Sequence, residues 1–87
     1  MATVSIPLLF KDVTGGARRA EVEGSTLAEI VAALDAIYPG LEARLRDGDK
    51  ISPTVAFTVD GKIAARGLAT AVGPESEVCV LPSFGGG

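Results

Sequence analysis

One amphipathic helix, set between segments that alternate every second residue, constrains the fold of this chain more than any other feature. Thr26 and Glu29 have capping-box spacing, so the Thr26 hydroxyl can accept from the Glu29 amide and the Glu29 carboxylate can reach back to the Thr26 amide. The apolar stripe predicted for this helix is Leu27, Ile30, Val31, Leu34 and Ile37. Pro39 disfavours a helical residue before it and ends the helix at Tyr38.

The segments on both sides of this helix have the patterns of strands. The opening stretch 3–10 is predicted to be a strand, because every second residue from Val4 is apolar. A turn signal at 14–16 leads into a second, polar strand at 17–23, and the two strands are expected to form a hairpin. The elements expected after the helix are a short helix at 41–46 with a Glu42–Arg46 pair, a loop at 47–50, a strand at 55–59, a hairpin turn at Asp60-Gly61, a return strand at 62–64, a compact turn or single helical turn at 67–72 and a last strand at 77–81.

This order of elements predicts an α+β fold in a single domain. A hairpin, a helix across the sheet and a final strand beside the first strand give two layers around one core. With 5% aromatic residues, that core must be built mainly from Val, Ile, Leu and Ala. The folded domain is predicted to span 1–82, because Pro82 has no amide to donate and stops the last strand. Residues 83–87 are expected to form a flexible tail.

The composition argues against several classes of function. A net charge of −3 without a basic run disfavours nucleic acid as a partner. One cysteine, Cys79, and no histidine exclude an internal disulfide and a zinc site, and no metal site is expected. A free-standing enzyme is therefore the least favoured class. The chain lacks a signal-peptide pattern and a membrane-spanning segment, so a cytoplasmic protein that does not bind membranes is expected.

The glycine-rich end, Gly85-Gly86-Gly87, indicates chemistry at the terminal carboxylate. Glycines here cannot stabilise a fold, but they form a side-chain-free segment that can enter a narrow active site. A carboxylate becomes an acyl donor only after activation. Adenylation by ATP would supply a leaving group, and a sulfur nucleophile could then displace AMP. A partner must hold the ATP, because this chain has no phosphate-binding loop. Taken alone, the same glycines fit a frayed terminus equally well.

The residues before the glycines are candidates for contact with a partner. Phe84 is a large apolar residue on the expected tail and could anchor in a partner's groove, although it could also fold back on the sheet. If Val78 and Val80 face the helix, Cys79 and Leu81 face outward and could form a partner patch, ordinary strand packing being the alternative. Nothing beside Cys79 in the sequence would activate its thiol. The residues predicted to bind partners are Cys79, Leu81, Pro82, Ser83, Phe84, Gly85 and Gly86.

Five pieces of the sequence carry a family resemblance over essentially the whole length. They are the opening 4–7, the turn at 14–16, the helix start at 26–27, the turn at 67–71 and the end 78–82 running into Gly85-Gly86. With these pieces the chain resembles the MoaD/ThiS family of ubiquitin-like sulfur carriers, and within it the carriers for cysteine biosynthesis in actinobacteria. The di-glycine after an apolar strand is the most specific of the five.

The resemblance implies a β-grasp fold, a mixed sheet of four to five strands with one main helix across it. It implies that an E1-like adenylyltransferase activates the terminal glycine and that a sulfurtransferase step converts it to a thiocarboxylate. The acceptor would be an activated serine on a PLP-dependent synthase in cysteine biosynthesis, with later release by a metalloprotease, or a pterin precursor in molybdopterin biosynthesis. The chain itself would bind no cofactor, and ATP would be used by the activating partner.

One departure from the family pattern leaves the functional terminus open. Family members usually end in two glycines, whereas this chain has three, so the reactive group is Gly87 as the chain stands or Gly86 after trimming. We take Gly87 as the predicted site. Two other functions remain compatible with the sequence, a ubiquitin-like modifier joined to lysines and a β-grasp binding module with a passive tail.

Overall fold

A five-stranded sheet in the order β2-β1-β7-β5-β6 forms one layer of the computed structural model, which describes residues 1–83. Its strands are β1 (Ala2–Ser5), β2 (Arg19–Val22), β5 (Val55–Val59), β6 (Lys62–Ile63) and β7 (Glu77–Pro82). The central pair, β1 and β7, is parallel, and the other pairs are antiparallel. The prediction of an α+β fold with a mixed sheet is confirmed.

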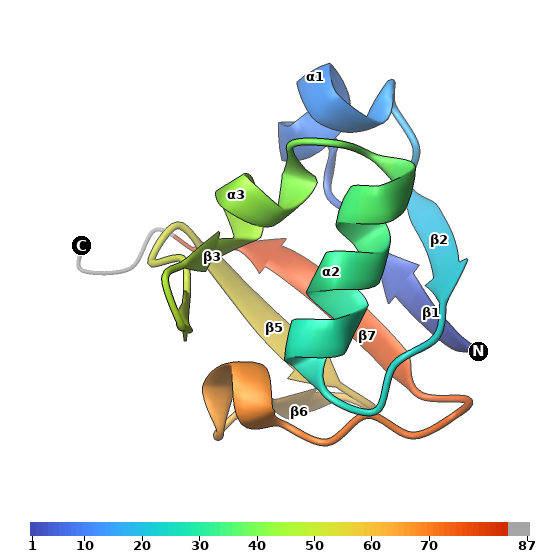
Figure 1. Cartoon of the computed structure of the whole chain (residues 1–87), viewed down its shortest axis with the longest axis vertical. Helices are drawn as coiled ribbons and strands as arrows, with labels where there is room; N and C mark the ends of the chain where they lie inside the picture. Colours follow the sequence, from blue (N-terminus) through green and yellow to red (C-terminus); the bar gives the residue numbers. More distant parts are fainter. Residues whose placement is uncertain (84–87) are drawn as a thin grey trace.

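Helix α2 (Leu27–Ile37) lies across one face of this sheet (Figure 1). The Thr26 hydroxyl accepts from the Glu29 amide at 3.3 Å, as the capping box predicts. The return contact differs from the prediction, because Glu29 Oε1 accepts from the Ser25 amide at 2.8 Å and from the Ser25 hydroxyl at 3.1 Å. Both bonds lower the pKa of Glu29, and the bond from the Ser25 amide has the larger effect. The Thr26 position itself is bridged to Ala71.

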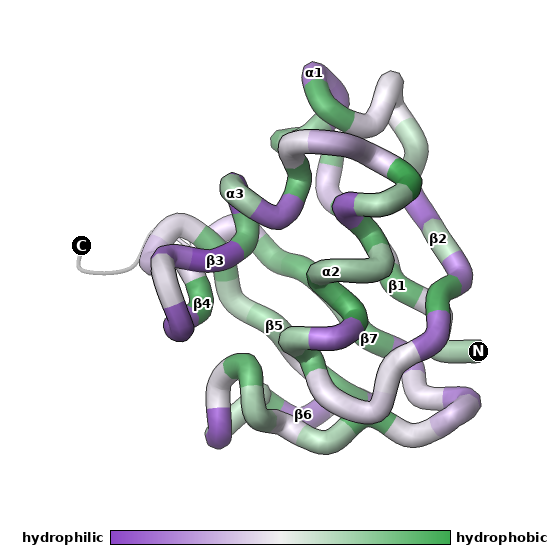
Figure 2. The backbone as a smooth tube through the Cα atoms, in the orientation of Figure 1, coloured by the Kyte–Doolittle hydropathy of each residue, from purple (hydrophilic) through white to green (hydrophobic). Residues whose placement is uncertain are grey.

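The apolar stripe of α2 supplies the centre of the core. Its buried members are Leu27, Ile30, Val31 and Leu34, each 0% exposed. The prediction that Ile37 belongs to this stripe is wrong, because its side chain is 50% exposed. At 3.6 residues per turn, Ile37 lies roughly 70° from the middle of the stripe, and it is the last residue of the helix. Figure 2 shows the hydrophobic stretches of β1, β5 and β7 lying beneath α2.

The chain after β1 differs from the predicted strand 3–10. Strand β1 ends at Ser5, and the chain continues as a 3-10 turn, η1 (Leu8–Phe10), and one turn of helix, α1 (Lys11–Thr14). This path buries Phe10 to 1% exposure. The turn signal at 14–16 ends α1, since the Gly15 amide donates to the Lys11 carbonyl at 2.8 Å with Gly15 at φ 70°. The β1–β2 hairpin pairing itself is confirmed.

The second half of the chain follows the prediction more closely. Helix α3 (Leu41–Leu45) is present, and Arg46 pairs with Glu42 at 3.1 Å. The predicted loop at 47–50 is a tight hairpin between β3 (Arg46–Asp47) and β4 (Lys50–Ile51). A single 3-10 turn, η2 (Gly67–Ala69), lies within the predicted turn at 67–72. The β5–β6 turn has Asp60 at φ 51° and Gly61 at φ 81°, as a two-residue turn of type I′ requires.

Candidate functional site

Strand β7 brings the end of the chain out from the middle of the sheet. It lies between β1 and β5, and its last residue, Pro82, is paired with Val55. The prediction that Pro82 stops this strand is wrong, because Pro82 is still part of β7 and the Ser83 amide donates to the Thr54 carbonyl at 2.9 Å. Backbone groups alternate in direction along an antiparallel strand, so the nitrogen of Pro82 points away from β5 and toward β1. The pairing between β1 and β7 ends at Cys79, so no β1 carbonyl lies opposite this nitrogen. A proline is tolerated there because no donor is needed.

Ser83 is therefore attached to the folded domain by its backbone. The predicted site residues Phe84, Gly85, Gly86 and Gly87 lie outside the described residues. The division into a domain at 1–82 and a flexible tail at 83–87 stays a prediction for those four residues. What the structure establishes is the point of exit, at the end of β7 beside Thr54.

The face of the sheet opposite α2 carries the two residues predicted to face a partner. Val78 and Val80 are buried under the helix at 0% and 3% exposure, so Cys79 and Leu81 lie on the opposite face. The predicted facing of these four side chains is confirmed. Leu81 is 44% exposed and lies next to the point of exit.

Three more residues of this face lie in register with Cys79 and Leu81. Thr58 is paired with Cys79, Ala56 with Leu81, and Ile63 with Thr58. Ile63 is 81% exposed, the largest value among the exposed large hydrophobic side chains of residues 1–83. We name Ala56, Thr58, Ile63, Cys79 and Leu81 the open-face patch. Ile63 was not singled out from the sequence, although the two-residue turn at Asp60-Gly61 fixes its place opposite Thr58.

The start of β7 is held by a polar network around Asp60. Its carboxylate accepts from the Glu77 amide at 2.9 Å and from the Ser76 hydroxyl at 2.8 Å, and its amide donates to the Glu77 carbonyl at 2.8 Å. The hydrogen bond from the Glu77 amide is the main cause of a lowered pKa at Asp60, followed by the bond from Ser76. This network fixes the β5–β6 turn against β7 at the end of the sheet remote from Ser83.

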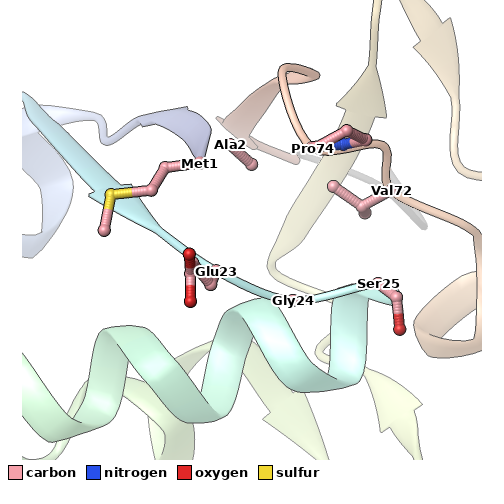
Figure 3. Close-up of a pocket in the computed structure, with 7 residues that line it drawn as sticks. All are labelled: Met1, Ala2, Glu23, Gly24, Ser25, Val72 and Pro74. Atoms are coloured by element: carbon pink, nitrogen blue, oxygen red, sulfur yellow. The ribbon is translucent and has the colours of Figure 1, made fainter.

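A hollow of about 240 Å³ also lies at that remote end (Figure 3). It is lined by Met1, Ala2, Glu23, Gly24, Ser25, Val72 and Pro74. Its volume is below the roughly 300 Å³ at which small-molecule pockets usually begin. Thr3 is paired with Glu77 in the parallel register, so the hollow adjoins the start of β7 and is separated from the point of exit by the length of that strand.

Among residues 1–83, no group of three or more Cys, Asp or Glu side chains is placed to hold a metal ion. No helix in the same range has the length and hydrophobicity to cross a membrane.

Comparisons with known proteins place this geometry beside a set of small carriers. The model of the ThiS family matches residues 9–87. The sulfur carrier protein CysO of Mycobacterium tuberculosis (strain ATCC 25618 / H37Rv) is 34% identical over 90 residues, covering 98% of this chain and 97% of the relative. The match therefore extends over nearly the whole of both chains.

Solved structures agree in fold over the same length. The crystal structure of the Amycolatopsis orientalis BexX/CysO complex contains a chain with a TM-score of 0.91 and 29% identity, with 100% of both chains covered. The crystal structure of Mycobacterium tuberculosis CysO gives a TM-score of 0.87 at 32% identity, covering 97% of this chain and 100% of that one. H. volcanii small archaeal modifier protein 1 gives 0.68 at 28% identity, covering 95% and 97%. The predicted ubiquitin-like β-grasp fold is confirmed.

Proposed function

This chain belongs to the ThiS family, and from that membership we propose that it is a sulfur carrier whose Gly87 carboxylate is the group that takes up and donates sulfur. The observation that carries the proposal is the likeness to a sulfur carrier protein over 98% of the chain, together with a family match that reaches residue 87. In this role the chain is a protein cosubstrate rather than a catalyst.

The proposed chemistry has two steps. In the first, the Gly87 carboxylate attacks the α-phosphorus of ATP, the bond to pyrophosphate breaks, and an acyl adenylate forms. In the second, hydrosulfide attacks the acyl carbon, the bond to AMP breaks, and a thiocarboxylate remains. The activating partner, an E1-like adenylyltransferase with sulfurtransferase activity, holds the ATP and supplies the sulfur, so this chain binds no cofactor of its own.

The length of chain beyond Ser83 determines where that partner must dock. Gly87 is the fourth residue after Ser83, and a fully extended segment of four residues spans at most about 14 Å. Since the Ser83 amide is bonded to the Thr54 carbonyl, Gly87 can reach a partner's active site only if the partner approaches the end of β7 closely. Leu81 and its strand partner Ala56 lie there, and the open-face patch continues from them along the same face, so we assign this patch to partner binding.

The same geometry serves a second partner that accepts the sulfur. A similar chain was solved in the Amycolatopsis orientalis BexX/CysO complex, so one relative forms a complex with another protein. We propose that the acceptor here is a biosynthetic enzyme, such as a PLP-dependent synthase making cysteine or an enzyme of molybdopterin biosynthesis. We further propose that this exchange takes place in the cytoplasm.

A second function is favoured by one specific comparison. The H. volcanii structure at 28% identity is of a protein named a small archaeal modifier. An activated Gly87 could equally be attacked by a lysine amine, with loss of AMP and formation of an isopeptide bond. A third possibility, a binding module with a passive tail, requires no activation at all.

Intact-protein mass spectrometry distinguishes the three functions. The chain is incubated with ATP, sulfide and its cognate activating enzyme, and the C-terminal peptide is then isolated. A mass gain equal to the replacement of one oxygen by sulfur supports the carrier. Covalent adducts on lysines support the modifier, and an unchanged mass with an active partner supports the passive module. A reaction without ATP is the matched control and should give no change.

A further inference from the structure

Strand β2 forms one edge of the sheet and has a free side. Among residues 1–83, β1 is its one strand neighbour. The Ile6 amide donates to the Arg18 carbonyl at 2.9 Å, and antiparallel ladders alternate along the strand. Ala20 and Val22 therefore turn their backbone groups toward β1. Arg19 and Glu21 turn their N–H and C=O groups to the outside, where a further strand could pair with them.

The side chains on this edge carry opposite charges on one face. Arg19 and Glu21 are exposed, both lie on the face opposite α2, and neither is in an ion pair with another residue of 1–83. Between them stands Ala20, whose small side chain leaves the edge accessible. Strand β2 has no proline, so each of its residues keeps a backbone N–H that can donate. A hollow of about 360 Å³, lined by Thr3, Arg19, Ala20 and Glu21, lies open beside it.

We propose that a second copy of this chain pairs with this edge, β2 against β2, antiparallel about a two-fold axis at Ala20. In this register Arg19 faces Glu21 of the second copy, and Glu21 faces Arg19 of the second copy. Both residues turn their backbone groups outward, so each of the two pairs exchanges an N–H and a C=O in both directions. The backbone pattern and the charge pattern therefore agree on one register.

The charges also select this register over its neighbours. A shift by one residue would put the buried face of one copy beside the exposed face of the other. A shift by two places Arg19 opposite Arg19, or Glu21 opposite Glu21, and like charges directly across a strand pair are destabilising. Within the four residues of β2, Arg19–Val22, the edge is thus complementary to itself in one alignment.

The pairing joins two five-stranded sheets into one continuous sheet and leaves the proposed site free. Because the axis is perpendicular to the sheet, both α2 helices lie on the same side and the two β7 strands point in opposite directions. The exit points at Ser83 are therefore at opposite ends of the dimer, and the inference does not depend on the sulfur-carrier function. A contact of one short strand per copy is small, so we expect a dissociation constant of roughly 0.1–1 mM.

The first test measures self-association of the full chain by sedimentation from about 20 µM to about 2 mM. We expect monomers at low concentration and dimers at high concentration, with amide exchange at Arg19 and Glu21 slowing as dimers form. Arg19→Glu and Glu21→Arg each create two like-charge pairs, and each should weaken self-association at least tenfold. Arg18→Glu is the matched control, since it makes the same charge change at a neighbouring residue that faces Val22 of the second copy.

The second test mixes the two single-charge variants. In the mixture, the two acidic residues of the Arg19→Glu chain face the two basic residues of the Glu21→Arg chain, so both pairs carry opposite charges. The mixture should therefore dimerise at concentrations where each variant alone stays monomeric. One chain carrying both changes should again pair with itself. A wild-type chain that stays monomeric throughout overturns the proposal and leaves this edge to a strand of another protein. Dimers that resist both single variants, or a mixture that stays monomeric, overturn it as well.

Discussion

The two ends of strand β7 differ in how the chain is held. At its start, Ser76 and Glu77 are bound by the Asp60 carboxylate, which takes a hydrogen bond from each. At its far end, Leu81 is half-exposed and the strand passes to Ser83 at the surface of the sheet. The first end is built for stability, and the second leads directly to the proposed reactive terminus. Changes at the two ends should therefore separate folding from sulfur loading.

Removing Gly87 should separate sulfur loading from folding more clearly than any other change. Without it, we expect loading to fall to the background of the reaction without ATP, because the activated carboxylate is moved one residue closer to the domain. The melting temperature should stay within about 1 °C of the wild type, since no residue of the described core is changed. Mass spectrometry after the loading reaction and thermal unfolding measure the two effects. Full loading of the shortened chain would move the reactive terminus to Gly86.

Truncation of Val78 should lower the stability of the domain and leave loading unchanged, the reverse of removing Gly87. This side chain is 0% exposed beneath α2, and Val78→Ala should cost about 2 kcal/mol in the free energy of unfolding, or roughly 10 °C in melting temperature. At temperatures where the variant is folded, loading at Gly87 should proceed at the wild-type rate. Chemical denaturation measures the free energy of unfolding, and the loading assay measures the rate at Gly87.

Cys79→Ala is the matched control for Val78→Ala. It lies next in the same strand but on the opposite face, and it should change the free energy of unfolding by less than about 1 kcal/mol. Equal losses in the two variants would contradict the assignment of the two faces.

The predictable parts of this molecule rest on local signals. The start of α2 follows from the spacing of Thr26 and Glu29, and the β5–β6 hairpin follows from Asp60-Gly61. The outward facing of Cys79 and Leu81 also follows from the alternation of one strand. Each of these signals acts over a few residues, where propensity and periodicity suffice.

The features that were not predicted depend on packing between residues far apart in the sequence. Phe10 leaves the strand pattern because a helical turn buries it in the core, and no neighbour in sequence reveals that. Ile37 fits the helical spacing, but its exposure is set by where the sheet lies under the last turn of α2. The place of Ile63 in the open-face patch emerges only from the pairing of three strands. The predicted reactive residue Gly87 and the predicted partner-binding residues 84–86 lie outside the described part and stay predictions.

A charge placed in the open-face patch should weaken partner binding without unfolding the domain. Leu81 is 44% exposed next to the point of exit, so Leu81→Glu should raise the dissociation constant for the activating enzyme about tenfold, equivalent to about 1.4 kcal/mol. The melting temperature should change little. Calorimetric titration with the enzyme measures the effect.

Ile37→Glu is the matched control, because it makes the same change at a side chain of 50% exposure on α2, on the other face of the sheet. We expect it to leave the affinity unchanged. An equal loss in both variants would mean that binding responds to net charge rather than to the patch.

Neutralising Asp60 should have the smallest effect, and that effect should depend on pH. The hydrogen bonds from Glu77 and Ser76 hold the pKa of Asp60 below its ordinary value, so the carboxylate contributes stability above that ordinary value and loses it as pH falls through the folded pKa. Asp60→Asn keeps a residue that tolerates the left-handed backbone at this turn. The variant should therefore melt a few degrees below the wild type near pH 7, and the gap should narrow as the pH falls below 3.8, the ordinary pKa of an aspartate.

Thermal unfolding of both proteins across this pH range measures the gap. Asp47→Asn, at an exposed residue of β3 with no side-chain hydrogen bond to the rest of 1–83, removes the same charge and should leave no comparable gap. Loading at Gly87 should be the same in all three proteins at neutral pH, because Asp60 acts at the start of β7 and the reaction takes place beyond its end. Slower loading of Asp60→Asn under conditions where the variant is fully folded would show that the two ends of β7 are coupled. That result would contradict the separation between stability at one end and loading at the other.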